Sequence, residues 1–157
     1  MRLSLVLLRH GEAESAQGLQ DHSRRLTPHG QEQAANTAAA LRTAGFAPTL
    51  VLTSDAVRAR STAELAHATL APGAPCLREP GLYLAGLEAI AAVISRHATA
   101  RDVQLLVVGH NPGFSSAASI LAGESLRLGT GDAAHLVLEA DTWAEGLQMQ
   151  GAWELKK

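Results

Sequence analysis

Short apolar runs separate longer stretches of mixed composition along this chain. Three of the runs, at residues 3–8, 49–53 and 104–108, are mainly apolar and end in polar residues. Runs of this length are typical of strands that are buried on both faces of a parallel sheet. The sequence therefore predicts a central sheet that contains at least these three strands.

Helices are expected between and after these strands. Thr27 can cap the first helix, with Pro28 at its first position, and Gly45 marks its end. Ser54 and Asp55 offer caps for the second helix. The four expected helices span about residues 28–45, 54–70, 86–97 and 113–121.

Three further segments carry weaker patterns. Residues 11–28 lack helical periodicity and are expected to form a long surface loop, which in a compact domain is usually functional. Residues 71–80 contain three prolines and are expected to be irregular or to form an edge strand. Residues 134–139 and 147–155 alternate in polarity, which predicts two strands or a hairpin near a sheet edge.

The alternating order of strands and helices predicts an α/β fold. We expect a three-layer sandwich in which helices cover both faces of a mostly parallel sheet. The length of 157 residues suits one domain, and no repeat, low-complexity tract or linker divides the chain. Residues 1–157 are therefore expected to form a single domain.

Composition excludes several classes of protein. A formal net charge of -2 and an aromatic content of 3% argue against a nucleic-acid-binding protein or one attracted to an anionic membrane. The run at residues 3–8 is too short for a signal-peptide core or a membrane span, so a cytoplasmic location is expected. The single cysteine, Cys76, cannot form an intrachain disulfide.

Polar clusters follow each of the three buried strands. The clusters are Arg9-His10-Gly11-Glu12, Ser54 with Arg58, and Gly109-His110-Asn111. Ligands of open α/β sheets bind outside the carboxyl ends of the strands, so the three clusters should meet in one crevice. Arginine donors match phosphate oxygens, and a histidine with one unprotonated ring nitrogen can be a nucleophile. The sequence therefore predicts a site for a phosphoryl group.

Four motifs in order carry a resemblance to a known family. They are Arg9-His10-Gly11-Glu12, the segment from Asp21 to Thr27 with Arg24 inside it, Thr53-Ser54 followed by Arg58-Ala59, and Gly109-His110-Asn111-Pro112. Together they resemble the histidine phosphatase superfamily, which includes phosphoglycerate mutases. The short length and the second motif are most similar to its SixA-type branch of phosphohistidine phosphatases.

This resemblance implies a role for each matching residue. His10 would attack phosphorus and become a transient phosphohistidine, which water then hydrolyses. Arg9, Arg58 and His110 would bind the phosphoryl oxygens. The remaining residues expected at the substrate are Gly11, Glu12, Arg24 and Asn111. No metal or other cofactor is expected, because the arginines already supply positive charge.

Two assignments stay open in the sequence. Arg60 lies two residues after Arg58, and the motif alignment favours Arg58 as the arginine in the pocket. The general acid is also open, with Glu12 and Glu79 as candidates outside any clear acid motif. A phosphohistidine substrate needs less help from an acid, because its P–N bond has a good leaving group once the imidazole is protonated.

The function expected first is removal of a phosphoryl group from a protein phosphohistidine, for example on a histidine phosphotransfer domain. The alternatives are a phosphomonoesterase for a small phosphorylated metabolite and a non-catalytic module that binds phosphate or a phosphoprotein. His10 argues against the binding module, because binding alone does not need a nucleophile. The oligomeric state and the pathway do not follow from the sequence.

Overall fold

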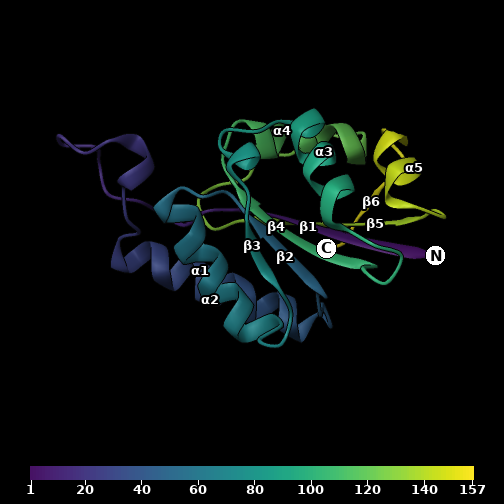
Figure 1. The fold of residues 1–157 in the computed structure, drawn as a ribbon, viewed down its shortest axis with the longest axis horizontal. Coiled ribbons are helices and arrows are strands. Elements are labelled where there is room, and N and C mark those ends of the chain that lie inside the picture. The colour runs from purple at the N-terminus through teal and green to yellow at the C-terminus, as the bar shows by residue number, and fades with distance from the viewer.

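The computed structural model describes all 157 residues, which form one six-stranded sheet with helices around it (Figure 1). The strands are β1 (Arg2–Arg9), β2 (Leu50–Thr53), β3 (Cys76–Arg78), β4 (Gln104–Gly109), β5 (Ala133–Glu139) and β6 (Glu154–Leu155). The α-helices are α1 (Pro28–Thr43), α2 (Val57–Leu70), α3 (Leu87–His97), α4 (Gly113–Ala122) and α5 (Trp143–Gln148). Two short 3-10 helices, η1 (Asp21–Ser23) and η2 (Pro80–Leu82), lie in loops. No helix has the length and apolar character needed to cross a bilayer.

The strands are arranged in the order β3-β2-β4-β1-β5-β6. Strands β3, β2, β4 and β1 are parallel to one another, whereas β5 runs antiparallel to β1 and to β6. The predicted mostly parallel sheet is therefore confirmed. The proline-containing segment at residues 71–80 supplies the edge strand β3, as expected.

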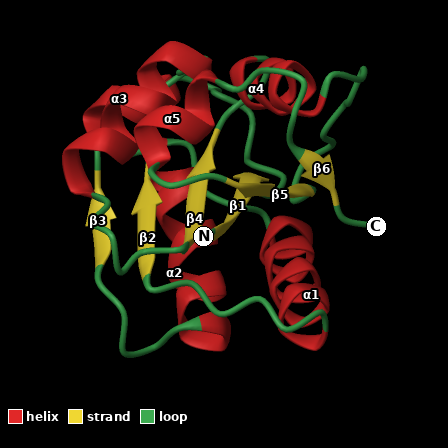
Figure 2. Cartoon of the chain, turned by 90° about the vertical axis from the view of Figure 1, so that its right-hand side faces the viewer, coloured by secondary structure: helices red, strands yellow, loops and turns green.

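The sheet lies between two layers of helices (Figure 2). Successive residues of β1 point to opposite faces, so Val6 and Leu8 pack with α1 and α2, whereas Leu3, Leu5 and Leu7 pack with α3, α4 and α5. Both faces of β1 are thus buried, which explains its continuous apolar run. The predicted three-layer α/β sandwich is confirmed.

The two predicted helix caps have different outcomes. The Thr27 side chain accepts a hydrogen bond from the Gly30 amide at 3.0 Å, which confirms the start of α1. The prediction for α2 is wrong, because its cap residue is Ala56 and no side chain caps it. Ser54 Oγ instead lies 2.8 Å from His110 Nε2, and Asp55 pairs with His22 at 3.0 Å. Neither residue is the cap of α2, although Ser54 Oγ also accepts a hydrogen bond from the Ala56 amide at 3.3 Å.

The strand predicted at residues 147–155 is wrong except for its last two residues. Residues 143–148 form α5, whose cap Thr142 accepts a hydrogen bond from the Glu145 amide at 3.1 Å. Trp143 and Leu147, one helical turn apart, are both buried in the core. The alternating polarity of this segment favoured a strand and gave no sign of the helical turn. Only Glu154 and Leu155 form a strand, β6, which pairs with β5.

Two glycines let α1 approach the strand end closely. A Cβ at Gly30 would lie 2.0 Å from the Glu12 carbonyl oxygen, and one at Gly11 would lie 2.3 Å from the Gly30 oxygen. Both distances are much shorter than a van der Waals contact, and the atoms that the added Cβ would meet belong to backbone, which cannot rotate out of the way as a side chain can. The first turn of α1 is therefore fixed against the segment that follows His10.

Gly30→Ala is expected to destabilise the protein by about 1–3 kcal/mol, although the same change inside a helix normally stabilises. The reason is the backbone overlap between the added Cβ and Glu12. Denaturant unfolding of the variant and of Gly73→Ala checks this, because a Cβ at Gly73 meets nothing within 4 Å. Equal stability of the two variants would contradict the close approach.

Candidate active site

The three polar clusters meet where β1, β4 and β2 end. Arg9 pairs with Gly109 and Thr53 pairs with Val108, so the three neighbouring strands end nearly level. The residues that follow them, His10, His110 and Ser54, are consequently brought to one edge of the sheet. A cavity of about 630 Å³ opens there. Its lining includes seven of the eight predicted site residues: Arg9, His10, Glu12, Arg24, Arg58, His110 and Asn111.

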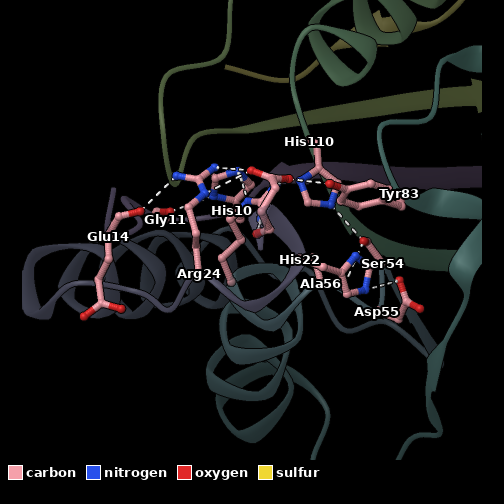
Figure 3. A network of polar contacts seen from close by, with 12 residues as sticks. His10, Gly11, Glu14, His22, Arg24, Ser54, Asp55, Ala56, Tyr83 and His110 are labelled. Carbon is pink, nitrogen blue, oxygen red and sulfur yellow. Dashed lines mark hydrogen bonds and ion pairs between the residues drawn. The ribbon is translucent and has the colours of Figure 1, made fainter. Parts of the chain in front are cut away.

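His10 is held in one orientation with one unprotonated ring nitrogen. Its side chain is buried, and Nδ1 lies 2.7 Å from the carbonyl oxygen of Gly11 (Figure 3). A carbonyl oxygen only accepts, so the neutral ring carries its proton on Nδ1 and donates it there. Nε2 is left with a lone pair, and the Arg58 Nε–H donates to it at 3.3 Å. The arrangement suits a nucleophile.

Burial keeps both histidines of the site neutral at pH 7. Desolvation, with a smaller contribution from Arg58 and Arg9, lowers the pKa of His10 to about 4. Desolvation, followed by the charge of Arg58, lowers the pKa of His110 to about 3. The two rings lie 5.2 Å apart between their centroids. The lone pair of His10 is therefore available across the physiological pH range.

Arg58, rather than Arg60, faces the cavity. Its side chain is only 3% exposed, and besides His10 it donates to the carbonyl oxygen of Asp21 at 2.6 Å and to the Asp21 carboxylate at 2.9 Å. Arg60 does not line the cavity. Thr62, one turn along α2, donates to the Arg58 carbonyl at 2.8 Å and accepts from the Gly11 amide at 3.1 Å. Thr62 thereby joins the arginine helix to the loop after His10.

The backbone of Leu128 orients two further site residues. Its carbonyl oxygen accepts from Arg9 at 3.1 Å and from the amide nitrogen of Asn111 at 2.7 Å. The Asn111 side-chain oxygen accepts from both the amide and the hydroxyl of Ser115. Both polar atoms of the Asn111 side chain are therefore hydrogen-bonded within the protein, whereas the Nε of Arg9 has no protein partner.

His110 is fixed through one nitrogen and unpartnered at the other. Nε2 lies 2.8 Å from Ser54 Oγ, and the residue is 1% exposed (Figure 3). Nδ1 has no hydrogen-bond partner. Because the Ser54 hydroxyl can donate to Nε2, the proton of the neutral ring can reside on Nδ1, where it is available to an acceptor.

Asp21 and Tyr83 belong to the site but were not predicted there. The Asp21 carboxylate accepts from Arg58, from Arg24 Nε and NH2 at 3.0 Å each, and from the Tyr83 hydroxyl. The hydrogen bonds from Tyr83 and then Arg58 hold the pKa of Asp21 well below its usual range. Its position three residues before Arg24 was an available signal. Tyr83, by contrast, has no signal in the sequence.

The two candidate acids lie in different places. Glu79 Oε2 accepts from Arg96 at 2.5 Å and lies 2.8 Å from His97 Nε2, outside the cavity. Glu12 lines the cavity, and its carboxylate accepts from the Thr27 hydroxyl at 2.8 Å. The structure thus turns Glu79 away from the reaction. No group of three His, Cys, Asp or Glu side chains is arranged to hold a metal ion.

The low histidine pKa values make stability depend on pH. An unfolded chain titrates these rings near 6.5, above the folded pKa values of about 4 and about 3, so below pH 6.5 it binds more protons than the fold does. The free energy of unfolding should therefore fall from pH 6.5 towards pH 4, by about 3 kcal/mol for His10 alone. Denaturant unfolding between pH 4.5 and 8 checks this, and His10→Asn should flatten the slope. A flat wild-type profile would contradict it.

Comparison with known proteins agrees with this geometry. The sequence model described as "Histidine phosphatase superfamily (branch 1)" matches residues 5–83. An uncharacterised chloroplastic protein of Arabidopsis thaliana is 33% identical over 97% of this chain and 75% of its own length. A Nakamurella multipartitia structure, provisionally assigned as phosphohistidine phosphatase SixA, is 29% identical with a TM-score of 0.80, covering 100% of this chain and 95% of that one. The corresponding Agrobacterium tumefaciens protein is 25% identical with a TM-score of 0.76, covering 88% and 98%.

Proposed function

This chain is a phosphatase of the histidine phosphatase superfamily, and from that premise we propose that it works through a covalent phosphohistidine on His10 and acts on protein phosphohistidine. The observation that carries the first part is the orientation of His10. Its proton is committed to the Gly11 carbonyl, so the opposite nitrogen offers a lone pair inside a cavity lined by three arginines.

The proposed reaction has two displacement steps. The lone pair of His10 Nε2 forms a bond to phosphorus while the bond from phosphorus to the leaving nitrogen breaks. A substrate imidazole that is protonated on its other nitrogen departs as a neutral ring. Water then attacks phosphorus, inorganic phosphate leaves with both water protons, and His10 returns to its neutral form.

Hydrogen-bond donors of the cavity would stabilise the transferring group. Arg9 has an unpartnered Nε, and His110 has an unpartnered Nδ1 that can donate to a phosphoryl oxygen. Two Arg58 donors are engaged by Asp21, so a bound phosphoryl group would share or displace that carboxylate. Arg24, on the other side of the same carboxylate, would be released with Arg58.

The contacts of Asp21 and Glu79 support a phosphoramidate substrate. Asp21 is held ionised by Tyr83 and Arg58, and Glu79 pairs outside the cavity with Arg96 and His97. An alkoxide leaving group needs a proton from the enzyme, whereas a protonated imidazole does not. These contacts therefore favour a phosphohistidine over a phosphoester.

One observation favours a second candidate, a phosphatase for a small phosphorylated metabolite. The cavity of about 630 Å³ is large enough for a compact metabolite, and Glu12 at its edge would then be the available carboxylate. A purely phosphate-binding module is less well supported, because binding does not require the free lone pair of His10.

Turnover of two substrates without added metal tests the proposal. A histidine-phosphorylated phosphotransfer domain and an aryl phosphate are compared, each with wild type and His10→Ala. Preference for the phosphoprotein, lost in His10→Ala, is expected. Turnover of the aryl phosphate alone would favour the metabolite phosphatase, and a wild type that binds phosphate but turns over neither would favour the binding module.

A further inference from the structure

Leu84 is an exposed leucine at the edge of the cavity. It lines the cavity, yet 57% of it is exposed, and its φ of 55° places it in the left-handed region. Leucine is disfavoured in both respects, because this backbone region suits glycine and its apolar side chain faces solvent. Strained residues tend to cluster at functional sites.

The backbone around Leu84 holds the side chain outward. Its neighbours Leu82 and Ala85 are both buried, on either side of Tyr83 and Leu84. Gly113 at the start of α4 packs so closely that a Cβ there would lie 1.9 Å from the Ala85 carbonyl oxygen. The exposed leucine is therefore presented from a fixed segment.

A second exposed leucine lies on the loop that carries Asp21, the partner of Tyr83 in a hydrogen bond. The loop before η1 projects from the body of the molecule in Figure 1, and Leu19 within it is 48% exposed. One residue, Gln20, separates Leu19 from Asp21, so their Cα atoms lie at most about 7 Å apart. The base of the loop is held by the pairing of Ala13 with Leu26 and by the ion pair between His22 and Asp55.

We propose that Leu84 and Leu19 form a docking rim for the protein that carries the phosphorylated histidine. The inference rests on the proposed function, since the cavity supplies the anion site and the rim supplies the apolar contact next to it. Leu84 adjoins Tyr83, and Leu19 precedes Asp21 by two residues, so each leucine is close in the chain to one partner of the Asp21–Tyr83 hydrogen bond. A protein surface can bury such leucines at the moment that its phosphoryl group enters the cavity.

Two variants test the rim with a matched control. Leu84→Gly removes the apolar side chain and accepts the positive φ, so the fold is not weakened. Leu19→Ser removes the second leucine from an exposed position. Leu65→Ser is the control, because Leu65 is 37% exposed on α2 and does not line the cavity. Each is assayed on a histidine-phosphorylated phosphotransfer domain and on free phosphohistidine.

For Leu84→Gly we expect KM for the phosphoprotein to rise roughly 10-fold, with a smaller rise for Leu19→Ser. KM for free phosphohistidine should rise much less, by no more than about threefold, because a free amino acid covers far less of the rim than a protein surface does. Leu65→Ser should match wild type on both substrates. Equal losses on the two substrates, or none, would overturn the rim alone. A wild type that hydrolyses free phosphohistidine but not the phosphoprotein would overturn the proposed protein substrate, and the rim with it.

Discussion

His10→Asn should lower kcat by at least about 10⁴-fold on every phosphorylated substrate. Asparagine can still accept or donate one hydrogen bond near Gly11, but it has no nucleophilic nitrogen to form the covalent intermediate. His29→Asn is the matched control, because His29 is an exposed histidine on the first turn of α1. Steady-state rates of the two variants on one substrate make the comparison.

The covalent step has its own signature. Rapid quenching of wild type during turnover should trap a phosphoryl group that is stable in alkali and lost in acid, at one site per chain. His10→Asn should trap none. A variant that keeps more than a few per cent of wild-type kcat would remove His10 from the nucleophile's role, even if it still binds phosphate.

The parts of the fold that were predicted correctly depend on local physical rules. The apolar run of β1 is continuous because both its faces are buried, and the Thr27-Pro28 start of α1 follows from side-chain capping. The same rules failed at Ser54, which is not the cap residue of α2 and whose hydroxyl lies against His110 Nε2. A polar residue that can cap a helix can equally be recruited by a distant partner, and only the tertiary structure decides.

Sheet topology accounts for only part of the predicted site, because Arg24, and Arg58 rather than Arg60, were assigned to it by the motif resemblance. Arg9, His10 and His110 lie at strand ends, so sheet topology alone brings them together. Asp21 and Tyr83 come from two loops, and loop geometry is not encoded in any periodic pattern. Asp21 accepts hydrogen bonds from both Tyr83 and Arg58, and Tyr83 lies more than sixty residues after Asp21 in the chain.

The choice between Arg58 and Arg60 shows a different limit. Residues two apart on a helix point about 200° away from each other, so only one of the two can face the cavity. Helical periodicity predicts that Arg58 and Arg60 lie on different faces of the helix, but it does not predict which of them faces the cavity. The orientation of α2 is set by its packing through Ala59, Ala63 and Ala66 against the sheet, which leaves Arg58 beside His10.

This orientation makes Arg58→Gln the second large expected effect, a loss of roughly 10²–10³-fold in kcat. Glutamine keeps a polar side chain but removes the charge and the paired donors that match phosphoryl oxygens. Arg60→Gln on the same helix is the matched control and should stay close to wild type, because Arg60 does not line the cavity.

Two readouts separate a role in the reaction from a role in folding. Loss of Arg58 frees Asp21, which is about half exposed and can be hydrated, so thermal stability should change little. Inhibition by inorganic phosphate should weaken together with kcat, since the same donors would hold both product and transferring group. Arg58→Lys should recover part of the binding but less of the rate, because an ammonium group keeps the charge without the planar pair of donors. Equal losses in Arg58→Gln and Arg60→Gln would show instead that the general positive charge of α2, rather than the position beside His10, drives the rate.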